Sequence, residues 1–230
     1  PNLESMKRLS IAFLFLLTNA VFGQVLKPGF DKAEYIETLK INHKVHIPLD
    51  KWEENKNVPN PQDFTFAFRS PVVAFDNIWD LWIHKEKPLA LISVQGSVPT
   101  DASFLANLYA AMVPAKGDLQ LDKDFLFRYT LAEHPKAAVH VGWLVAMAYL
   151  SKTVESKIDS LYSKGIRDFI LTGHSQGGGI TFMLTSHLLQ LQLDGKLPQD
   201  IQFKTYCSAG PKPGNLFFAY DYEKKTEGGW

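Results

Sequence analysis

Several segments of the chain carry apolar residues at the spacing of an amphipathic helix. In the first of them the apolar positions are Phe30, Ala33, Ile36 and Leu39. The polar, proline-rich sequence that follows is expected to form a surface loop. A second helix is predicted from Ala102 to Val113, with Thr100 or Asp101 as its cap. The longest is predicted from Gly142 to Lys164, and Gly165 lies just beyond its end.

Continuous apolar runs between these segments predict β-strands. VVAFDNIWDLWIH (72–84) and LALISVQ (89–95) are separated by KEKP, a charged sequence that suits a hairpin turn. The second run is apolar at nearly every position, as expected of a strand buried on both faces. A strand (168–172), a helix (178–193) and a strand (201–209) then follow with short connections. This order is the unit of a helix-covered parallel sheet, so an α/β fold with a mostly parallel sheet is predicted.

The composition indicates one globular domain. Of the 230 residues, 46% are hydrophobic and 13% aromatic, enough to fill a substantial core. Lysine and arginine total 24, as do aspartate and glutamate, so there is no general basic field and nucleic-acid binding is not expected. Cys207 is the only cysteine, so no intramolecular disulfide can form. The histidines are scattered without ligand spacing, so neither a metal nor another cofactor is expected.

The N-terminal sequence has the features of a secretory signal peptide. Residues 6–8 form a short positive region, LSIAFLFLL (9–17) an apolar one, and TNAVFG a small-residue exit. Cleavage is expected near Gly23, which predicts a secreted protein, either extracellular or periplasmic. The apolar run is shorter than the roughly 20 residues that cross a bilayer, so no integral membrane span is expected. Residues 1–5 are interpreted as lying upstream of the natural start, and residues 24–230 as one domain.

Glycines surround a single serine where the strand at 168–172 gives way to a helix. Gly173, Ser175 and Gly177 match the pattern G-x-S-x-G. A sharp strand-to-helix turn lifts such a serine clear of the backbone, and only small residues fit two positions before and after it. The turn also places the serine at a helix N-terminus, where free N–H groups favour developing negative charge. Ser175 is therefore predicted to be a nucleophile.

A serine nucleophile needs a base and preformed hydrogen-bond donors for the oxyanion of the tetrahedral intermediate. The backbone N–H of Gln176, directly after the serine, is one candidate donor. The loop SVQGSVP (93–99) offers the other, because Gly96 allows close approach and Ser97 has both an N–H and a hydroxyl group. From the residues alone, a second interpretation is equally well supported, in which Gly96 and Ser97 only end a strand.

Four separated stretches together resemble one family. They are LALISVQGS, AAVHVGWLVAMAYL, LTGHSQGGGITFML and TYCSAGPKPGNLFFAY, which span residues 89–220 in the expected order. They are similar to motifs of the class 3 lipases, a group of α/β-hydrolases that includes fungal triacylglycerol lipases. The sequence as a whole also resembles secreted Bacteroidetes proteins of that family. The resemblance implies an α/β-hydrolase fold, with Ser175 as nucleophile and with Ser97 and Gln176 forming the oxyanion hole.

The chain also departs from the family pattern. Gln95 stands where the family usually has arginine, and Gln176 where it most often has leucine. His174 occupies the variable position of the serine turn and is interpreted as a packing or hydrogen-bonding residue. His140 matches a family histidine that is interpreted as structural. His43 and His46 lie in the predicted polar loop and are expected to be exposed to solvent.

The resemblance leaves the catalytic acid and base unassigned. In α/β-hydrolases both follow the nucleophile, and the family's aspartate and histidine are expected beyond Trp230, together with further strands. His187 falls inside the helix after the serine turn, while Asp221 and Glu223 are interpreted as surface carboxylates. The domain is therefore expected to be truncated, and the 230-residue form to have little or no turnover.

The leading hypothesis is a secreted serine carboxylic-ester hydrolase that forms an acyl-enzyme on Ser175 and acts on acylglycerols at a lipid–water interface. One face of the predicted helix at 102–113 is apolar, and its residues are Phe104, Leu105, Leu108 and Met112. This face is interpreted first as part of the core. The alternative is that it forms a lid over the site, and FLFRY (125–129) is a rival lid segment. Alternatives are another esterase, either a phospholipase or a plant-wall acyl esterase, and a catalytically dead hydrolase fold that serves as a binding module.

Overall fold

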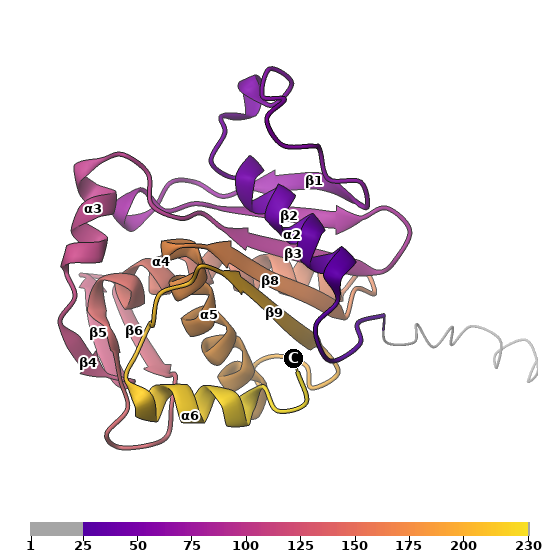
Figure 1. Ribbon diagram of the computed structural model, residues 1–230. Helices are drawn as coiled ribbons and strands as arrows, with labels where there is room; N and C mark the ends of the chain where they lie inside the picture. Colours follow the sequence, from indigo (N-terminus) through magenta and orange to yellow (C-terminus); the bar gives the residue numbers. More distant parts are fainter. Residues whose placement is uncertain (1–24, 230) are drawn as a thin grey trace, which may run out of the picture.

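A five-stranded sheet forms the centre of the molecule, in the order β1-β2-β3-β8-β9 (Figure 1). The computed structural model describes residues 25–229, so the predicted signal peptide lies outside the described residues. The strands are β1 (Phe64–Arg69), β2 (Trp79–His84), β3 (Leu89–Val94), β8 (Asp168–His174) and β9 (Gln202–Ser208). β2 is antiparallel to both neighbours, whereas β3, β8 and β9 are mutually parallel. The α/β fold and the hairpin between β2 and β3 are confirmed, while β1 was not predicted.

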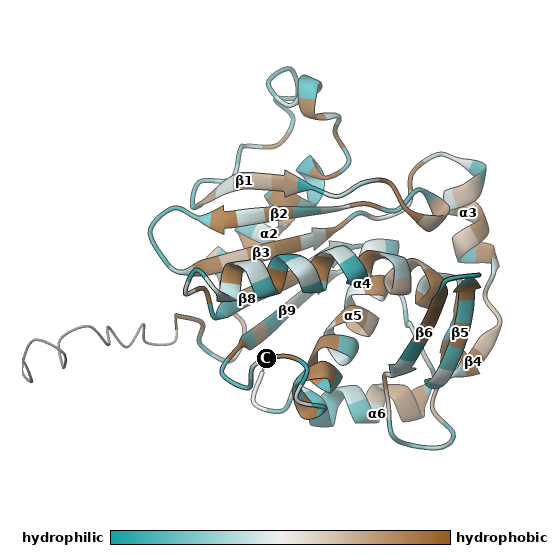
Figure 2. Cartoon of the chain, turned by 180° about the vertical axis from the view of Figure 1, so that it is seen from behind, coloured by the Kyte–Doolittle hydropathy of each residue, from teal (hydrophilic) through white to brown (hydrophobic). Residues whose placement is uncertain are grey.

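Helices cover both faces of this sheet, as predicted for an α/β fold. The helix α2 (Lys32–Lys44) lies on one face, and α4 (Val141–Tyr162) and α5 (Gln176–Leu193) lie on the other (Figure 2). Because side chains alternate along a strand, β3 sends Leu91 into the core under α2 and Ile92 into the core under α4 and α5. Leu91 and Ile92 are both fully buried, which explains why this strand is apolar throughout.

The helix α2 buries a polar face, contrary to the apolar spacing seen in the sequence. Phe30, just before it, is 72% exposed, and Ile36 is 42% exposed. The buried positions instead include Asn42, whose side chain donates to Thr172 Oγ1 at 3.0 Å and accepts from Ser93 Oγ at 2.8 Å. Both partners lie on the central strands, so hydrogen bonds satisfy the polar groups that α2 places against the sheet.

The helix α3 (Asp101–Leu108) is shorter than predicted and is capped by Thr100, which accepts a hydrogen bond from Ser103 N. The chain then leaves the helix for β4 (Met112–Pro114), which pairs with β7 (Ala138–His140). The interpretation of its apolar face as core is wrong, because these side chains are exposed. The exposed fractions are 55% for Phe104, 55% for Leu105, 79% for Leu108 and 49% for Met112.

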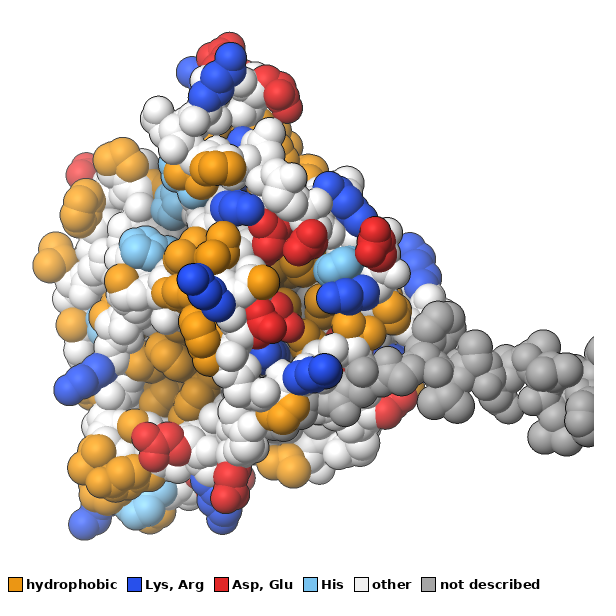
Figure 3. Space-filling model, turned by 45° about the vertical axis from the view of Figure 1, so that its right-hand side comes forward, with side chains coloured by type: hydrophobic (Ala, Val, Ile, Leu, Met, Phe, Trp, Pro, Cys, Tyr) orange, Lys and Arg blue, Asp and Glu red, His pale blue; other side chains and the backbone are white. Residues whose placement is uncertain are grey.

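The segment between β4 and β7 forms a hairpin of β5 (Lys116–Asp122) and β6 (Phe125–Thr130). The remaining elements are the short helices η1 (Leu49–Lys51) and η2 (Ala74–Asp76) and the helix α6 (Leu216–Lys225). Across residues 25–229, no helix combines the length and the apolar character needed to cross a membrane. On the face drawn in Figure 3, acidic and basic side chains are interspersed and form no single patch.

Candidate active site

Ser175 occupies a strained turn between β8 and α5. Its backbone has φ 54° and ψ −127°, a conformation that residues with a side chain rarely adopt. Its N–H donates to Ser208 O at 3.0 Å, which fixes the turn to the end of β9. Strain of this kind persists only where the surroundings enforce it, and it is the feature expected of a serine held out for reaction.

Close backbone contacts explain the glycines on either side of Ser175. A Cβ atom added to Gly173 would lie 2.3 Å from Gly177 O, so the two ends of the turn touch. A Cβ atom on Gly177 would lie 2.3 Å from Val94 O and 2.8 Å from Gln95 O. The first turn of α5 therefore packs directly against the end of β3, and any side chain at either position would force the two segments apart.

The parallel register brings the ends of three strands to one edge of the sheet. Val94 lies beside Gly173, and His174 lies beside Ser208. The loop after β3 therefore emerges next to the serine turn, which is the arrangement predicted for Ser97 and Ser175. Ligands commonly bind at this edge of a parallel sheet, beyond the carboxyl ends of the strands.

Two backbone N–H groups remain available at this edge. The N–H of Gln176 belongs to the first turn of α5 and has no intrahelical partner by position. The N–H of Ser97 donates to no other group in the part of the chain that the structure describes. The helix dipole of α5 adds a favourable field for negative charge near Ser175. This edge of the sheet therefore has donors suited to a developing oxyanion.

A polar side chain that the sequence did not point to holds Ser97. Asn107, on α3, donates from Nδ2 to Ser97 Oγ at 2.9 Å. Its Oδ1 accepts from Trp143 Nε1 at 3.1 Å, so the amide is fixed at both ends. His140 stacks on Trp143 at a centroid distance of 4.1 Å and caps α4 by accepting from Trp143 N, which gives it a structural role. The chain of contacts thus runs from α4 through α3 to Ser97.

The loop is held on its other side by residues that follow α2. Gln95, in the place of the usual arginine, donates from Nε2 to Val45 O at 3.1 Å. Gly96 N donates to His46 Nε2 at 3.3 Å. His46 is solvent-exposed, as predicted, whereas His43 lies on α2 and is half-buried. Nothing in the sequence indicated that His46 reaches this loop, 50 positions away. His174 is also exposed and its Nδ1 lies 3.0 Å from Ser208 Oγ, as its interpretation as a hydrogen-bonding residue requires.

The side chain of Gln176 has an unusual environment. It is 2% exposed, and neither its Nε2 nor its Oε1 has a hydrogen-bond partner within residues 25–229. Most buried carboxamides are hydrogen-bonded, because an unpaired buried polar group costs about 1–3 kcal/mol. The leucine more usual at this position would avoid that cost.

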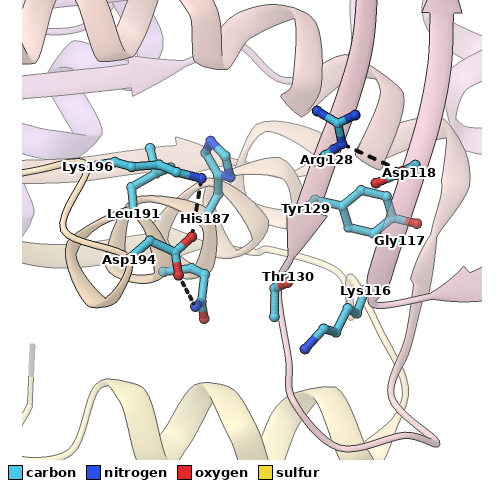
Figure 4. Close-up of a pocket in the computed structure, with 11 residues that line it drawn as sticks. Lys116, Gly117, Asp118, Arg128, Tyr129, Thr130, His187, Leu191, Asp194 and Lys196 are labelled. Atoms are coloured by element: carbon cyan, nitrogen blue, oxygen red, sulfur yellow. Dashed lines mark hydrogen bonds and ion pairs between the residues drawn. The ribbon is translucent and has the colours of Figure 1, made fainter.

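His187 lies far from the serine turn and is engaged elsewhere. It is 12 positions after Ser175 on the same helix, or about 18 Å along the axis at the standard rise. Its Nε2 is 2.8 Å from Glu155 Oε1. It lines a hollow of about 340 Å³ between α5 and the β5–β6 hairpin (Figure 4). Asp221 and Glu223 lie on α6, and Asp221 pairs with Lys225 at 3.1 Å.

One protein-family model and several solved structures are similar to this chain. The model of the family described as Lipase (class 3) matches residues 91–228. Similar solved structures are Rhizomucor miehei triacylglyceride lipase, a fungal lipase–inhibitor complex and a triacylglycerol lipase with a serine-protease triad, at TM-scores of 0.59, 0.58 and 0.55. Their sequence identities are 14%, 16% and 16%, and each match covers 85% of this chain.

The chain spans 67% of each of these three proteins, and 58% of Rhizomucor miehei lipase in its propeptide complex. At these identities the similarity establishes the fold. A search of curated protein sequences finds no match.

Proposed function

We propose that this chain, which belongs to the class 3 lipase family, forms the main part of a serine ester hydrolase in which Ser175 is the nucleophile. The observation that carries the proposal is the strained turn at Ser175, beside two backbone N–H groups that have no hydrogen-bond partner within residues 25–229. A structural glycine turn would have no need for a serine at φ 54° next to a second loop that is anchored on both sides.

The geometry supports acyl transfer in two steps. Ser175 Oγ attacks the ester carbonyl carbon and loses its proton to a base, and the carbonyl oxygen becomes an oxyanion. The N–H groups of Gln176 and Ser97 donate to this oxygen. Collapse of the intermediate expels the alcohol, which takes the proton, and leaves the acyl group on Ser175. Water then repeats the sequence and releases the acid.

The acid and base of this reaction are proposed to follow Trp230 in the full protein. One of the similar structures is a triacylglycerol lipase whose catalytic centre is a serine-protease triad. Its chain extends beyond the matched part, since the match covers 67% of it. The edge of the sheet at Ser175 is the place where such partners would have to reach, because a base must come within hydrogen-bond distance of the serine hydroxyl.

Acylglycerols at a lipid–water interface are the proposed substrate. The support is the exposed apolar side of α3, which follows directly from the loop that carries Ser97. Large apolar patches of this kind mark interaction surfaces on soluble proteins. The rival lid segment 125–129 is strand β6, where Phe127 and Tyr129 are buried, so it does not offer such a surface. Export from the cell is proposed from the signal-peptide sequence.

Two assays on the full-length protein test these proposals. Ser175→Ala should abolish hydrolysis of p-nitrophenyl esters, while Ser163→Ala, at the exposed end of α4, should leave the rate unchanged. Equal rates for Ser175→Ala and wild type would defeat the nucleophile assignment.

The double variant Leu105→Ser with Leu108→Ser tests the apolar side of α3. It should slow hydrolysis of emulsified acylglycerol but not of a dissolved short-chain ester. Leu193→Ser is the matched control, because Leu193 is 69% exposed, between the values for Leu105 and Leu108, but lies at the far end of α5.

A further inference from the structure

Within the part of the chain that the structure describes, three side-chain contacts hold residues 95–97 of the loop that carries Ser97, and one of them ends on a titratable group. Gln95 Nε2 bonds to Val45 O at 3.1 Å, and Asn107 Nδ2 bonds to Ser97 Oγ at 2.9 Å. Both of these donors are carboxamides, which do not titrate. The third contact, from Gly96 N to His46 Nε2 at 3.3 Å, ends on an imidazole. Imidazole is the side chain whose ordinary pKa lies near physiological pH.

The position of Gly96 leaves little freedom for its peptide. A Cβ atom added there would lie 2.7 Å from His174 O on one side and 3.4 Å from His46 Nε2 on the other. Gly96 is therefore confined between the His46 ring and the serine turn. Since Ser97 follows directly, a displacement of Gly96 changes the distance between the N–H of Ser97 and that of Gln176.

Hydrogen bonds hold the backbone on either side of His46 in place. Arg69 donates from Nη1 to Ile47 O at 2.8 Å and from Nη2 to Lys44 O at 3.2 Å, which anchors the backbone on both sides of His46. Arg69 also forms an ion pair with Asp80, which is fully buried. The imidazole can therefore transmit a change at its nitrogen to Gly96 rather than move away with its own backbone.

The protonation state of the ring decides whether the contact can exist. Nε2 accepts from Gly96 N, so the neutral ring carries its proton on Nδ1. Protonation puts a hydrogen on Nε2 as well and removes the acceptor. The surroundings favour the neutral ring: although His46 is partly open to solvent, the desolvation of its covered part lowers its pKa, and the neighbouring His174, His43 and Arg69 lower it further through charge repulsion.

We propose that His46 is a positioning residue for the oxyanion loop: its neutral imidazole holds Gly96 beside the serine turn, and protonation of the ring releases Gly96 and displaces the N–H of Ser97. The effect on turnover rests on the proposed function, because it requires Ser97 to be an oxyanion donor. The coupling between His46 and Gly96 does not require it.

Nuclear magnetic resonance tests the coupling without any need for activity. In the wild-type protein, the amide resonance of Gly96 should shift with pH along the same curve as the His46 ring. In His46→Gln, whose carboxamide oxygen can accept without titrating, the Gly96 resonance should be independent of pH. His43→Gln, on the same side of the fold but in contact with Asn55, should leave the Gly96 resonance titrating together with His46, with the midpoint moved toward higher pH because the repulsion from His43 is removed. A Gly96 resonance that ignores the His46 titration, or that still titrates in His46→Gln, would overturn the proposal.

Kinetics of the full-length protein then test the role. Loss of one ordinary hydrogen bond corresponds to about a five-fold change in rate. We therefore expect the ratio of the wild-type kcat to the His46→Gln kcat to fall about five-fold as His46 is protonated, with KM unchanged, because titration of the catalytic base affects both proteins alike. A ratio that does not change with pH would show that His46 does not position the loop. Loss of activity in Ser175→Ala reports on the proposed function separately.

Discussion

Replacement of Gln176 by leucine should make the protein more stable. The side chain is 2% exposed, and both polar atoms of its carboxamide are buried without a partner in the region the structure describes. Leucine fills a similar volume and removes the cost of about 1–3 kcal/mol for an unpaired buried polar group. For a domain of about 200 residues, this corresponds to a rise of roughly 3–10 °C in Tm.

A second glutamine on the same helix provides the matched control. Gln192 is also buried, at 8% exposed, but its Nε2 donates to Pro198 O and to Ile201 O, both at 2.9 Å. Gln192→Leu leaves two carbonyl groups without their donor, and we expect it to lower the free energy of unfolding by about 1–3 kcal/mol. The two variants therefore make the same chemical change at two sites and should differ in sign.

Thermal and denaturant unfolding, followed by circular dichroism, measure both variants against wild type. The midpoint should rise for Gln176→Leu and fall for Gln192→Leu, with no change in the denaturant m-value. If Gln176→Leu destabilised the protein as much as Gln192→Leu does, the carboxamide of Gln176 would have partners that hold it. The reasoning from its unpaired atoms would then be refuted.

Three further predictions concern the candidate active site, the contact between α5 and the sheet, and the helix α2. Asn107→Ala frees the Ser97 hydroxyl, and kcat of the full-length protein should fall about ten-fold with KM unchanged; a rise in KM alone would contradict this. Gly177→Ala puts a Cβ atom 2.3 Å from Val94 O and should lower the free energy of unfolding by about 3 kcal/mol in urea titrations; a wild-type midpoint would be the contrary result. Glu37 is a buried residue of α2. Burial raises the pKa of its carboxyl group, but hydrogen bonds from Lys40 and from the backbone N–H groups of Gln62 and Asp63 outweigh this and leave the pKa below its usual value. The stability it adds is therefore present above about pH 4.5 and lost as pH falls through the lowered pKa, so Glu37→Gln should cost about 1.5–3 kcal/mol at pH 7. That deficit should shrink in acid, and one that stayed constant down to pH 3 would exclude this role.

The parts of the fold that follow from local pattern were predicted well. The helix α4 and the unit β8–α5–β9 lie close to their expected bounds, because each has an uninterrupted apolar period and ends near a glycine. Gly165 and Gly195, which follow α4 and α5, have φ of 93° and 69°, in the left-handed region that glycine tolerates. The pattern G-x-S-x-G marked the serine turn for the same reason, since its glycines report a local backbone contact.

The parts that depend on distant residues were not predicted. Apolar spacing in α2 suggested a buried apolar face, whereas polar partners on β3 and β8 bury Asn42 instead. The apolar side of α3 gave the same signal as a core helix, yet nothing in the chain covers Leu108, which is 79% exposed within the described part of the protein. His46 and Asn107 had no sequence signal, because contact with the loop at 96–97 is formed only when the sheet is assembled.

Covalent labelling tests the assignment of Ser175 most directly. A p-nitrophenyl alkyl phosphonate transfers its phosphonyl group to an activated serine and releases p-nitrophenol, and mass spectrometry then locates the label. For the full-length protein we predict one label per chain, on the tryptic peptide 168–196, and none in Ser175→Ala. A label on another peptide, or ester hydrolysis that persists in Ser175→Ala, would contradict the account.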